Sequence, residues 1–294
     1  MQYPRPKTIL ELLKPITWFP PMFAFIFGVV SSGRPVLDHW LFILFGIALT
    51  GPMVCGTSQA VNDWFDRHVD AINEPQRPIP SGRMPGSWGF YIAVSWTLLS
   101  MALAAAMGSI VFWAACFGLV LAWAYSMPPL RLKQNGWWGN AAVALCYEGL
   151  PWFTGATVMT GAVPEWKILT VAGLYSLGAH GIMTLNDFKS LAGDRQLGVR
   201  SLPVQLGVNG AARLACLVMA VPQVVVAALL VHADRPRHAV VIGVLILSQF
   251  ALMARLLSDP RERAVWYSAT GVSLYVLGML ITALALRPII GGIS

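Results

Sequence analysis

The sequence has too little charge for the surface of a soluble protein. Asp, Glu, Lys and Arg make up 11% of its 294 residues, hydrophobic residues make up 56%, and the mean hydropathy is +0.64. Soluble globular chains carry about 25% charged residues. The hydrophobic residues fall in runs of roughly 16–24 residues, and about 20 apolar residues in a helix cross the hydrocarbon layer of a bilayer. The chain is therefore predicted to span a membrane.

None of these runs alternates between polar and apolar residues. Strands of a membrane barrel would alternate over about ten residues, and lipid leaves helices and closed barrels as the only spanning structures. The pattern predicts an all-α membrane protein, with a single polytopic domain over residues 1–294. Nine spans are expected, near residues 16–31, 38–61, 87–106, 109–126, 138–160, 164–186, 209–231, 238–257 and 264–286.

Cysteine and histidine are scarce, and neither is spaced for a metal site. The four cysteines contain no C-x-x-C pair and fall in or beside apolar runs, which is typical of small buried side chains. The five histidines likewise show no metal-ligand spacing.

The net charge of +7 is not arranged as a nucleic-acid surface. Lys and Arg are scattered over the polar segments, where membrane topology and anionic lipid explain them, so no nucleic-acid partner is expected. Of the 20 Lys and Arg, five fall on the minority side of the expected membrane: Arg34, Lys167, Arg235, Arg237 and Arg287. The positive-inside rule then places the N-terminus and the two long loops, 62–86 and 187–208, in the cytoplasm and the C-terminus outside it.

The first long loop begins with an acidic cluster. Asn62, Asp66 and Asp70 are four residues apart and so share one face of a helix, with Asp63 close beside it. Like charges at this spacing repel, and more so near a membrane, so a cation should offset them. Oxygen ligands suit Mg²⁺, which takes one or two carboxylates and completes its shell with water and substrate phosphate. A solvated acidic helix end is the alternative.

The second long loop repeats this pattern. Asp187 and Asp194 are seven residues apart, which predicts one helical face, and they too follow the cytoplasmic end of a span. Two such clusters can converge on one cavity. Basic residues lie among them and would neutralise a diphosphate there: Arg67, Arg77, Lys189 and Arg195.

Between the clusters lies the proline-rich stretch NEPQRPIPSG, residues 73–82. Pro75 disfavours the α conformation at Glu74, so the preceding helix is expected to end before it. The remaining prolines and Gly82 predict a stiff loop. Such a loop could hold Arg77 as a lid over the phosphates, and a plain turn is the alternative.

Three stretches resemble one family. NDWFDRHVDAINEPQRPIPSG (62–82), TLNDFKSLAGDRQLGVRSLPVQLG (184–207) and AYSMPPLRLKQNGWWGN (124–140) resemble the motifs of the UbiA-type membrane prenyltransferases, in the chlorophyll and bacteriochlorophyll synthase branch. The sequences of residues 130–149 and 176–207 are most similar to those of the purple-bacterial members. The resemblance implies a nine-helix bundle with a cytoplasmic polar cavity, in the inner or intracytoplasmic membrane of a bacterium. It also implies transfer of a geranylgeranyl or phytyl group from its diphosphate to the propionate of a (bacterio)chlorophyllide.

The resemblance also implies roles for individual residues. Asn62, Asp66 and Asp70 would form the first Mg²⁺ cluster and Asp194 part of the second, while Arg77 and Lys189 would contact the diphosphate. Arg131 and Lys133, in the stretch 124–140, are further candidates for diphosphate binding. One departure concerns the second motif, which the family often writes D-x-x-x-D, whereas Ser190 stands four residues before Asp194. Asp187 could substitute from one turn farther back.

The chemistry needs no general base. A propionate has a pKa near 4 and is already ionised at pH 7. The protein must instead position the reactants, stabilise charge and exclude water. Aromatic faces hold cations, and Trp64, Tyr125 and Tyr147 are candidates, with packing as the alternative. Glu148 and His180 lie inside expected spans, where each could contact the pigment or be structural.

Other functions remain open at this stage. A chlorophyll synthase acting on chlorophyllide a, or a quinone or haem prenyltransferase, would share the same metal clusters. A transporter would place its polar residues nearer the bilayer midplane, and a pigment-assembly scaffold would not need the carboxylates. Association with other pigment-biosynthesis or photosystem-assembly proteins is plausible beside catalysis.

Overall fold

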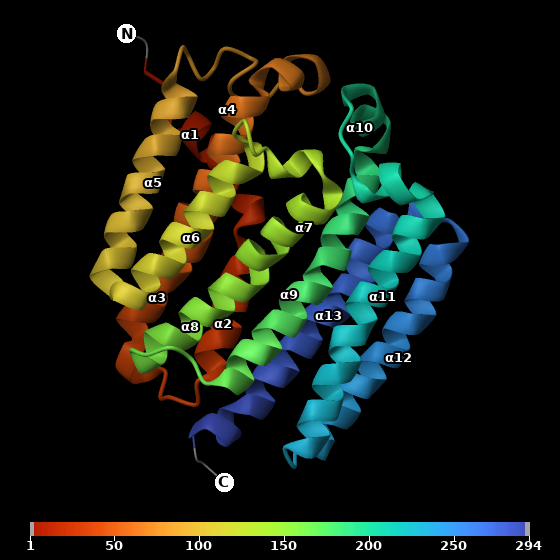
Figure 1. Cartoon of the computed structure of the whole chain (residues 1–294). Coiled ribbons are helices and arrows are strands. Elements are labelled where there is room, and N and C mark those ends of the chain that lie inside the picture. The colour runs from red at the N-terminus through yellow and green to blue at the C-terminus, as the bar shows by residue number, and fades with distance from the viewer. Residues whose placement is uncertain (1–2, 292–294) are drawn as a thin grey trace.

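The computed structural model describes residues 3–291, with side chains to Arg287. Helices joined by loops make up this part of the chain, and its one isolated bridge joins Asn135 and Arg200. The helices stand side by side as a bundle, with the N-terminus and α10 at one end and the C-terminus at the other (Figure 1). In chain order they are α1 Pro6–Leu13, η1 Pro15–Thr17, α2 Phe19–Ser31, η2 Leu37–His39, α3 Trp40–Ala48, η3 Leu49–Cys55, α4 Gly56–Asn73, α5 Trp88–Met107, α6 Ser109–Ser126, η4 Leu132–Gln134, α7 Gly136–Ala144, η5 Leu145–Gly149, α8 Leu150–Thr160, α9 Trp166–Asn186, η6 Asp187–Lys189, α10 Leu191–Leu197, α11 Leu202–His232, α12 Pro236–Ser258 and α13 Pro260–Gly291.

Fewer helices than expected meet the length and hydropathy of a membrane span. Within the described residues there are seven, or eight if Pro6–Thr17 and Phe19–Ser31, bent by 57°, form one span. The count of nine is therefore not confirmed. The difference lies at the expected span 138–160, which is a continuous helical rod of α7, η5 and α8 but carries polar side chains such as Asn140 and Glu148.

Small residues let helices of the bundle approach closely. A Cβ atom at Gly28 of α2 would collide with the carbonyl oxygen of Trp152 on α8, and one at Gly155 would collide with that of Phe25. Close backbone contact of this kind is a main source of helix association in lipid. Gly108, with φ 122°, is the one-residue turn between α5 and α6.

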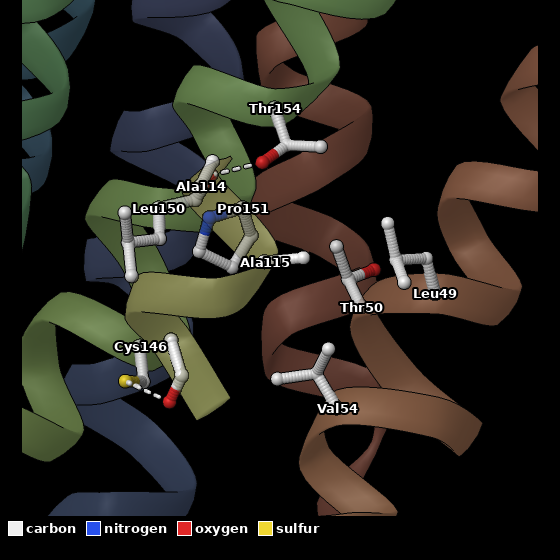
Figure 2. Close-up of a pocket in the computed structure, with 10 residues that line it drawn as sticks. Leu49, Thr50, Val54, Ala114, Ala115, Cys146, Leu150, Pro151 and Thr154 are labelled. Carbon is white, nitrogen blue, oxygen red and sulfur yellow. Dashed lines mark hydrogen bonds between the residues drawn. The ribbon is translucent and has the colours of Figure 1, made fainter. Parts of the chain in front are cut away.

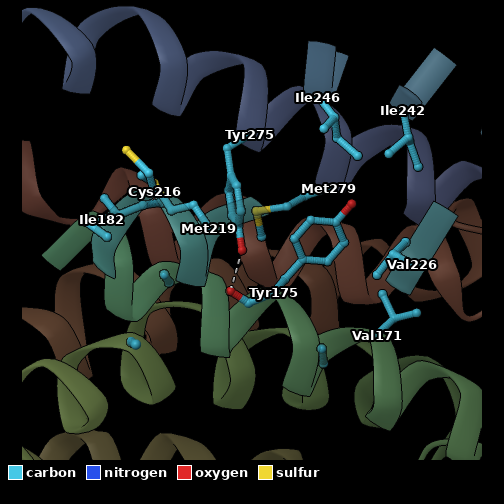
Figure 3. Packing of buried hydrophobic residues seen from close by; sticks show 14 of the residues in the cluster. Val171, Tyr175, Ile182, Cys216, Met219, Val226, Ile242, Ile246, Tyr275 and Met279 are labelled. Atoms are coloured by element: carbon cyan, nitrogen blue, oxygen red, sulfur yellow. Dashed lines mark hydrogen bonds between the residues drawn. The ribbon is translucent and has the colours of Figure 1, made fainter. Parts of the chain in front are cut away.

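The second half of the bundle has a tightly packed core. Figure 3 shows Tyr175 of α9, Met219 of α11, and Tyr275 and Met279 of α13 within one buried cluster. The Tyr275 hydroxyl donates to the Tyr175 carbonyl oxygen at 2.7 Å, so this polar group is satisfied away from water. Helices α9 and α13 of this core also form part of the wall of a cavity that is described below.

The two acidic segments differ in conformation. Helix α4 ends at Asn73 and Glu74 is non-helical (φ −140°), as the proline rule predicts. The prediction that Asp187 and Asp194 share a helical face is wrong, because η6 and α10 are separate and Ser190 lies between them. The Ser190 hydroxyl donates to Asp194 Oδ2 at 2.9 Å, and such local side-chain bonds compete with a continuous helix.

Candidate active site

A polar cavity of about 790 Å³ lies between the connections that follow α4, α6 and α9. Both acidic segments line it, as does the loop between α6 and α7. The charged and amide residues around it are Asn62, Asp66, Asp70, Asn73, Glu74, Arg77, Arg131, Lys133, Gln134, Asn140, Asp187, Lys189 and Asp194. Carboxylates and cations from distant parts of the chain thus share one compartment.

Helix α4 presents Asn62, Asp66 and Asp70 to this cavity. Asn62 Nδ2 donates to Asp66 Oδ2 at 3.1 Å and to Ser126 Oγ at 3.1 Å. Asp66 pairs with the amine of Lys133 and, at 3.2 Å, with Arg131 Nη2. Burial lowers the pKa of the Lys133 amine, although the neighbouring Asp66 carboxylate acts to raise it. The 127–135 loop therefore supplies the cations that face the first acidic cluster.

Asp63, expected as a metal ligand, lies elsewhere. It is 1% exposed, is not among the residues that line the cavity, and pairs with Lys14 Nζ at 2.7 Å and Arg77 Nη1 at 3.3 Å. The reason is helical geometry: Asp63 lies about 100° round the helix from Asn62, and there it meets the end of α1. Its placement fits a structural ion pair.

Arg77 links three carboxylates. Its Nη1 lies 2.8 Å from Asp70 Oδ2 and also reaches Asp63, while its Nε pairs with Glu74. Burial acts to lower the pKa of the Arg77 guanidinium, but the three carboxylates outweigh it and hold that pKa above its ordinary value. The 74–82 turn is thus attached to α4 at the edge of the cavity.

Asp187, in the second acidic segment, accepts a hydrogen bond from Asn140 Nδ2 at 3.0 Å. Asn140 Nδ2 also lies 3.4 Å from Thr184 Oγ1. Asn140, Ser126 and Lys14 are not among the site residues expected from the sequence. Asn140 closes the motif 124–140, so its position beside that motif was a usable signal. No spacing pattern links Lys14 to Asp63.

Besides Asp63, four expected site residues line none of the cavities: Trp64, Arg67, Arg195 and His180. Arg67 stacks over the Trp64 ring at 4.2 Å, and Trp64 in turn packs against Phe90. Arg195 is exposed on α10. His180 Nε2 lies 3.2 Å from the Trp137 carbonyl oxygen, which is the structural alternative for a buried histidine.

Two chambers continue from the polar cavity into the bundle. The first chamber, of about 290 Å³, shares Asn62, Tyr125, Asn140 and Asp187 with the polar cavity. It leads to the second chamber, a small apolar pocket between η3, α6 and the start of α8, where Leu49, Val54 and Ala115 face Leu150 and Pro151 (Figure 2). The path therefore runs from charged to apolar walls.

A third chamber, of about 570 Å³, lies beside the first, between α2, η5, α9 and α13. The two share Val143, Tyr147, Met183 and Asn186. Of the expected cation and substrate residues, Tyr125 lines the polar cavity and the first chamber, Tyr147 lines both chambers, and Glu148 lines the third.

The carboxylates are not preassembled as a metal cage. Within residues 3–291 no group of three or more His, Cys, Asp or Glu is close enough to hold an ion. The donor set nevertheless fits Mg²⁺, because this ion needs only one or two carboxylates and takes its other ligands from water and substrate phosphate. Asp66, Asp70, Asp187 and Asp194 offer those oxygens around one cavity.

Comparison with known proteins identifies the family to which this chain belongs. The model of the UbiA prenyltransferase family matches residues 19–286, most of the chain. The chain belongs to the UbiA prenyltransferase family. It is 57% identical to the bacteriochlorophyll synthase 33 kDa chain of Cereibacter sphaeroides, over 97% of this chain and 94% of that one, and so falls in the purple-bacterial branch of the family.

More distant members share the fold of this UbiA-family chain. Chlorophyll synthase of Oryza sativa subsp. japonica is 38% identical over 95% of this chain and 76% of the plant chain. The structure of a UbiA homolog from Archaeoglobus fulgidus bound to DMAPP and Mg²⁺ superposes with a TM-score of 0.73 at 18% identity, covering 96% of this chain and 99% of that one. The protein is therefore a helical membrane prenyltransferase.

Proposed function

We propose that the protein esterifies the propionate of bacteriochlorophyllide a with geranylgeranyl or phytyl diphosphate and releases diphosphate. The observation that carries the proposal is the cavity in which carboxylates and cations gather at one end and apolar chambers continue from it. The choice of acceptor is supported by the 57% identity to a bacteriochlorophyll synthase chain, against 38% to a chlorophyll synthase.

The polar cavity would bind the diphosphate. Arg77, Arg131, Lys133 and Lys189 line it and can donate charge-assisted hydrogen bonds to phosphate oxygens. The carboxylates of Asp66, Asp70, Asp187 and Asp194, with Asn62, would hold Mg²⁺. When bound, Mg²⁺ would neutralise the diphosphate and stabilise the oxygen that leaves. Because Asp66 and Asp70 already pair with three of these cations, the site has nearly balanced charge before substrate arrives.

In the proposed reaction one bond is exchanged for another. The bond between the prenyl C1 atom and the diphosphate oxygen breaks, and its electron pair leaves with the diphosphate. A propionate oxygen then supplies the pair for the new C1–O ester bond. No proton moves, since the propionate is already ionised at neutral pH. The protein contributes alignment, and the faces of Tyr125 and Tyr147 can stabilise positive charge on the allylic carbon.

The prenyl chain would occupy the first chamber and the small apolar pocket beyond it. Leu121, Ala122 and Val143 line the first chamber, and Leu49 and Leu150 line the small apolar pocket. Burying a prenyl chain there removes apolar surface from water and keeps water from the reacting carbon.

The proposal includes a topology. The ninth span would be the rod of α7, η5 and α8, whose polar residues face the interior cavities. The polar cavity and the N-terminus would face the cytoplasm of a bacterium and the C-terminus the periplasm, because Lys and Arg are concentrated at the cavity end.

The test is an assay of purified protein in detergent with bacteriochlorophyllide a, geranylgeranyl diphosphate and Mg²⁺, read by chromatography of the pigment. Esterified pigment is expected, and it should disappear with EDTA. Asp66→Asn should lower kcat about 100-fold or more, since it removes one charge-stabilising group from the site. Asp38→Asn is the matched control, because Asp38 is an exposed carboxylate in η2.

Other outcomes would move or end the proposal. Product that survives EDTA would contradict the metal. Turnover of chlorophyllide a, a quinone precursor or haem in place of bacteriochlorophyllide a would keep the prenyltransferase and change the acceptor. If no acceptor is turned over, a pigment-assembly scaffold or transporter becomes the better account.

A further inference from the structure

The third chamber has the volume and the walls of a site for an apolar ligand. Its volume of about 570 Å³ lies within the roughly 300–1,000 Å³ typical of ligand pockets. Most of its lining is apolar, from α2, α9 and α13. Phe19, Phe23 and Ser273 line it and are exposed at the bundle surface, so a ligand dissolved in lipid can reach it from the side.

Glu148 is an unexplained charge-bearing group in that wall. The side chain is 7% exposed, and its Oε2 atom is fully buried without a hydrogen-bond partner within residues 3–291. None of the residues that line the chamber is Lys, Arg or His. Leaving a buried polar atom unpaired costs about 1–3 kcal/mol, and an unpaired charge costs more. A partner supplied by a ligand would remove that cost.

The helix is deformed where Glu148 lies. Residues Leu145–Gly149 form the π-helical segment η5, a geometry that is frequent at functional sites. Three consecutive side chains of this segment serve three compartments. Cys146 lines the small apolar pocket and the first chamber, Tyr147 lines the first and third chambers, and Glu148 lines the third.

From this placement we infer that Glu148 is the residue that selects and orients the acceptor ring. The inference rests on the proposed function. The macrocycle lies in the third chamber, where the neutral carboxyl of Glu148 donates a hydrogen bond to a carbonyl group on the ring edge. The propionate passes Tyr147 and Asn186, which border both chambers, and reaches the prenyl carbon in the first.

The experiment compares Glu148→Gln with Glu148→Leu in lipid nanodiscs. Leu removes the hydrogen bond, so KM for bacteriochlorophyllide a and its Kd, measured from the pigment absorption without prenyl donor, should rise about tenfold. KM for geranylgeranyl diphosphate should stay unchanged. Gln keeps an N–H donor of similar size, so it should retain acceptor binding within about threefold of the wild type.

A third variant separates an effect on binding from an effect on folding. Thr157→Val removes another buried, unpaired polar atom from the same helical rod, outside all three chambers, and should leave both KM values unchanged. Thermal unfolding of each variant is recorded alongside. Equal acceptor Kd in wild type and Glu148→Leu would overturn the inference, and so would a Gln variant as weak as the Leu variant. If the wild type esterifies no tetrapyrrole, the proposed function itself has failed, which these comparisons keep distinct.

Discussion

At the scale of single residues, one turn of α4 shows how neighbouring carboxylates acquire different roles. Asp66 faces the polar cavity and meets Arg131 and Lys133. Asp63, three residues earlier, faces the end of α1 and meets Lys14 and Arg77. Position around the helix, rather than residue type, decides which carboxylate can reach a substrate.

This difference predicts distinct variants. Asp63→Asn should lower the free energy of unfolding by about 1–3 kcal/mol, because it removes the buried carboxylate that pairs with the half-buried Lys14. The Mg²⁺ concentration for half-maximal activity should stay unchanged, since Asp63 does not line the cavity. Thermal unfolding and a magnesium titration measure the two effects. A large shift in the magnesium requirement would restore Asp63 to the metal site.

At the scale of elements, the cavities depend on helices that touch backbone to backbone. Helix α2 packs on α8 through Gly28 and Gly155, and also contacts α13. These contacts fix one wall of the third chamber. The π-helical segments η3 and η5 lie where two of the packed rods pass the chambers, and each supplies chamber-lining side chains in place of regular packing.

Two glycine variants test this packing. Gly28→Ala should destabilise the protein by about 1–3 kcal/mol, since the new methyl group would collide with the Trp152 carbonyl oxygen and force the helices apart. Gly173→Ala on α9 meets no atom within 4 Å and should be neutral or stabilising by up to about 1 kcal/mol. Thermal unfolding in one detergent compares them. Equal effects would show that the α2–α8 contact is not tight.

At the scale of the whole molecule, the polar connections are collected at one end. The segments after α4 and α9 lie at the same end as the N-terminus, and the C-terminus lies at the other (Figure 1). The bridge between Asn135 and Arg200 joins the 127–135 loop to the segment after α10. Loops distant in sequence thus close around one cavity.

The proposed orientation predicts labelling from one side of the membrane. Gln196→Cys on α10 and Glu165→Cys before α9 both replace exposed residues, at opposite ends of the bundle. In bacterial cells with a permeable outer membrane, a membrane-impermeant thiol reagent should label only Glu165→Cys. Gln196→Cys should react after the inner membrane is broken. The reverse pattern would invert the topology, and the parent protein measures the background from its own cysteines.

The sequence alone was enough to predict the class of protein, the course of the helices and most of the charged residues around the polar cavity, although Asp63, Arg67 and Arg195 lie outside it. The length of the hydrophobic runs and their lack of alternation show that the chain is suited to lipid, whatever the tertiary contacts are. The i, i+4 spacing is a local property of one helix. For that reason Asn62, Asp66 and Asp70 could be placed on one face of α4 before any tertiary contact was known, and Pro75 could mark the end of that helix.

Which charged groups meet depends on the tertiary structure. Lys14 pairs with Asp63, and Asn140 contacts Asp187, across large distances in the sequence. Glu148 Oε2 finds no hydrogen-bond partner among the described residues because of how the helices around it pack. The break at Ser190 also depends on side-chain hydrogen bonds that no periodicity reveals. Local patterns constrain a residue's direction within its own helix. The identity of its partner depends on how the helices pack around the cavities, and that packing is a property of the whole chain.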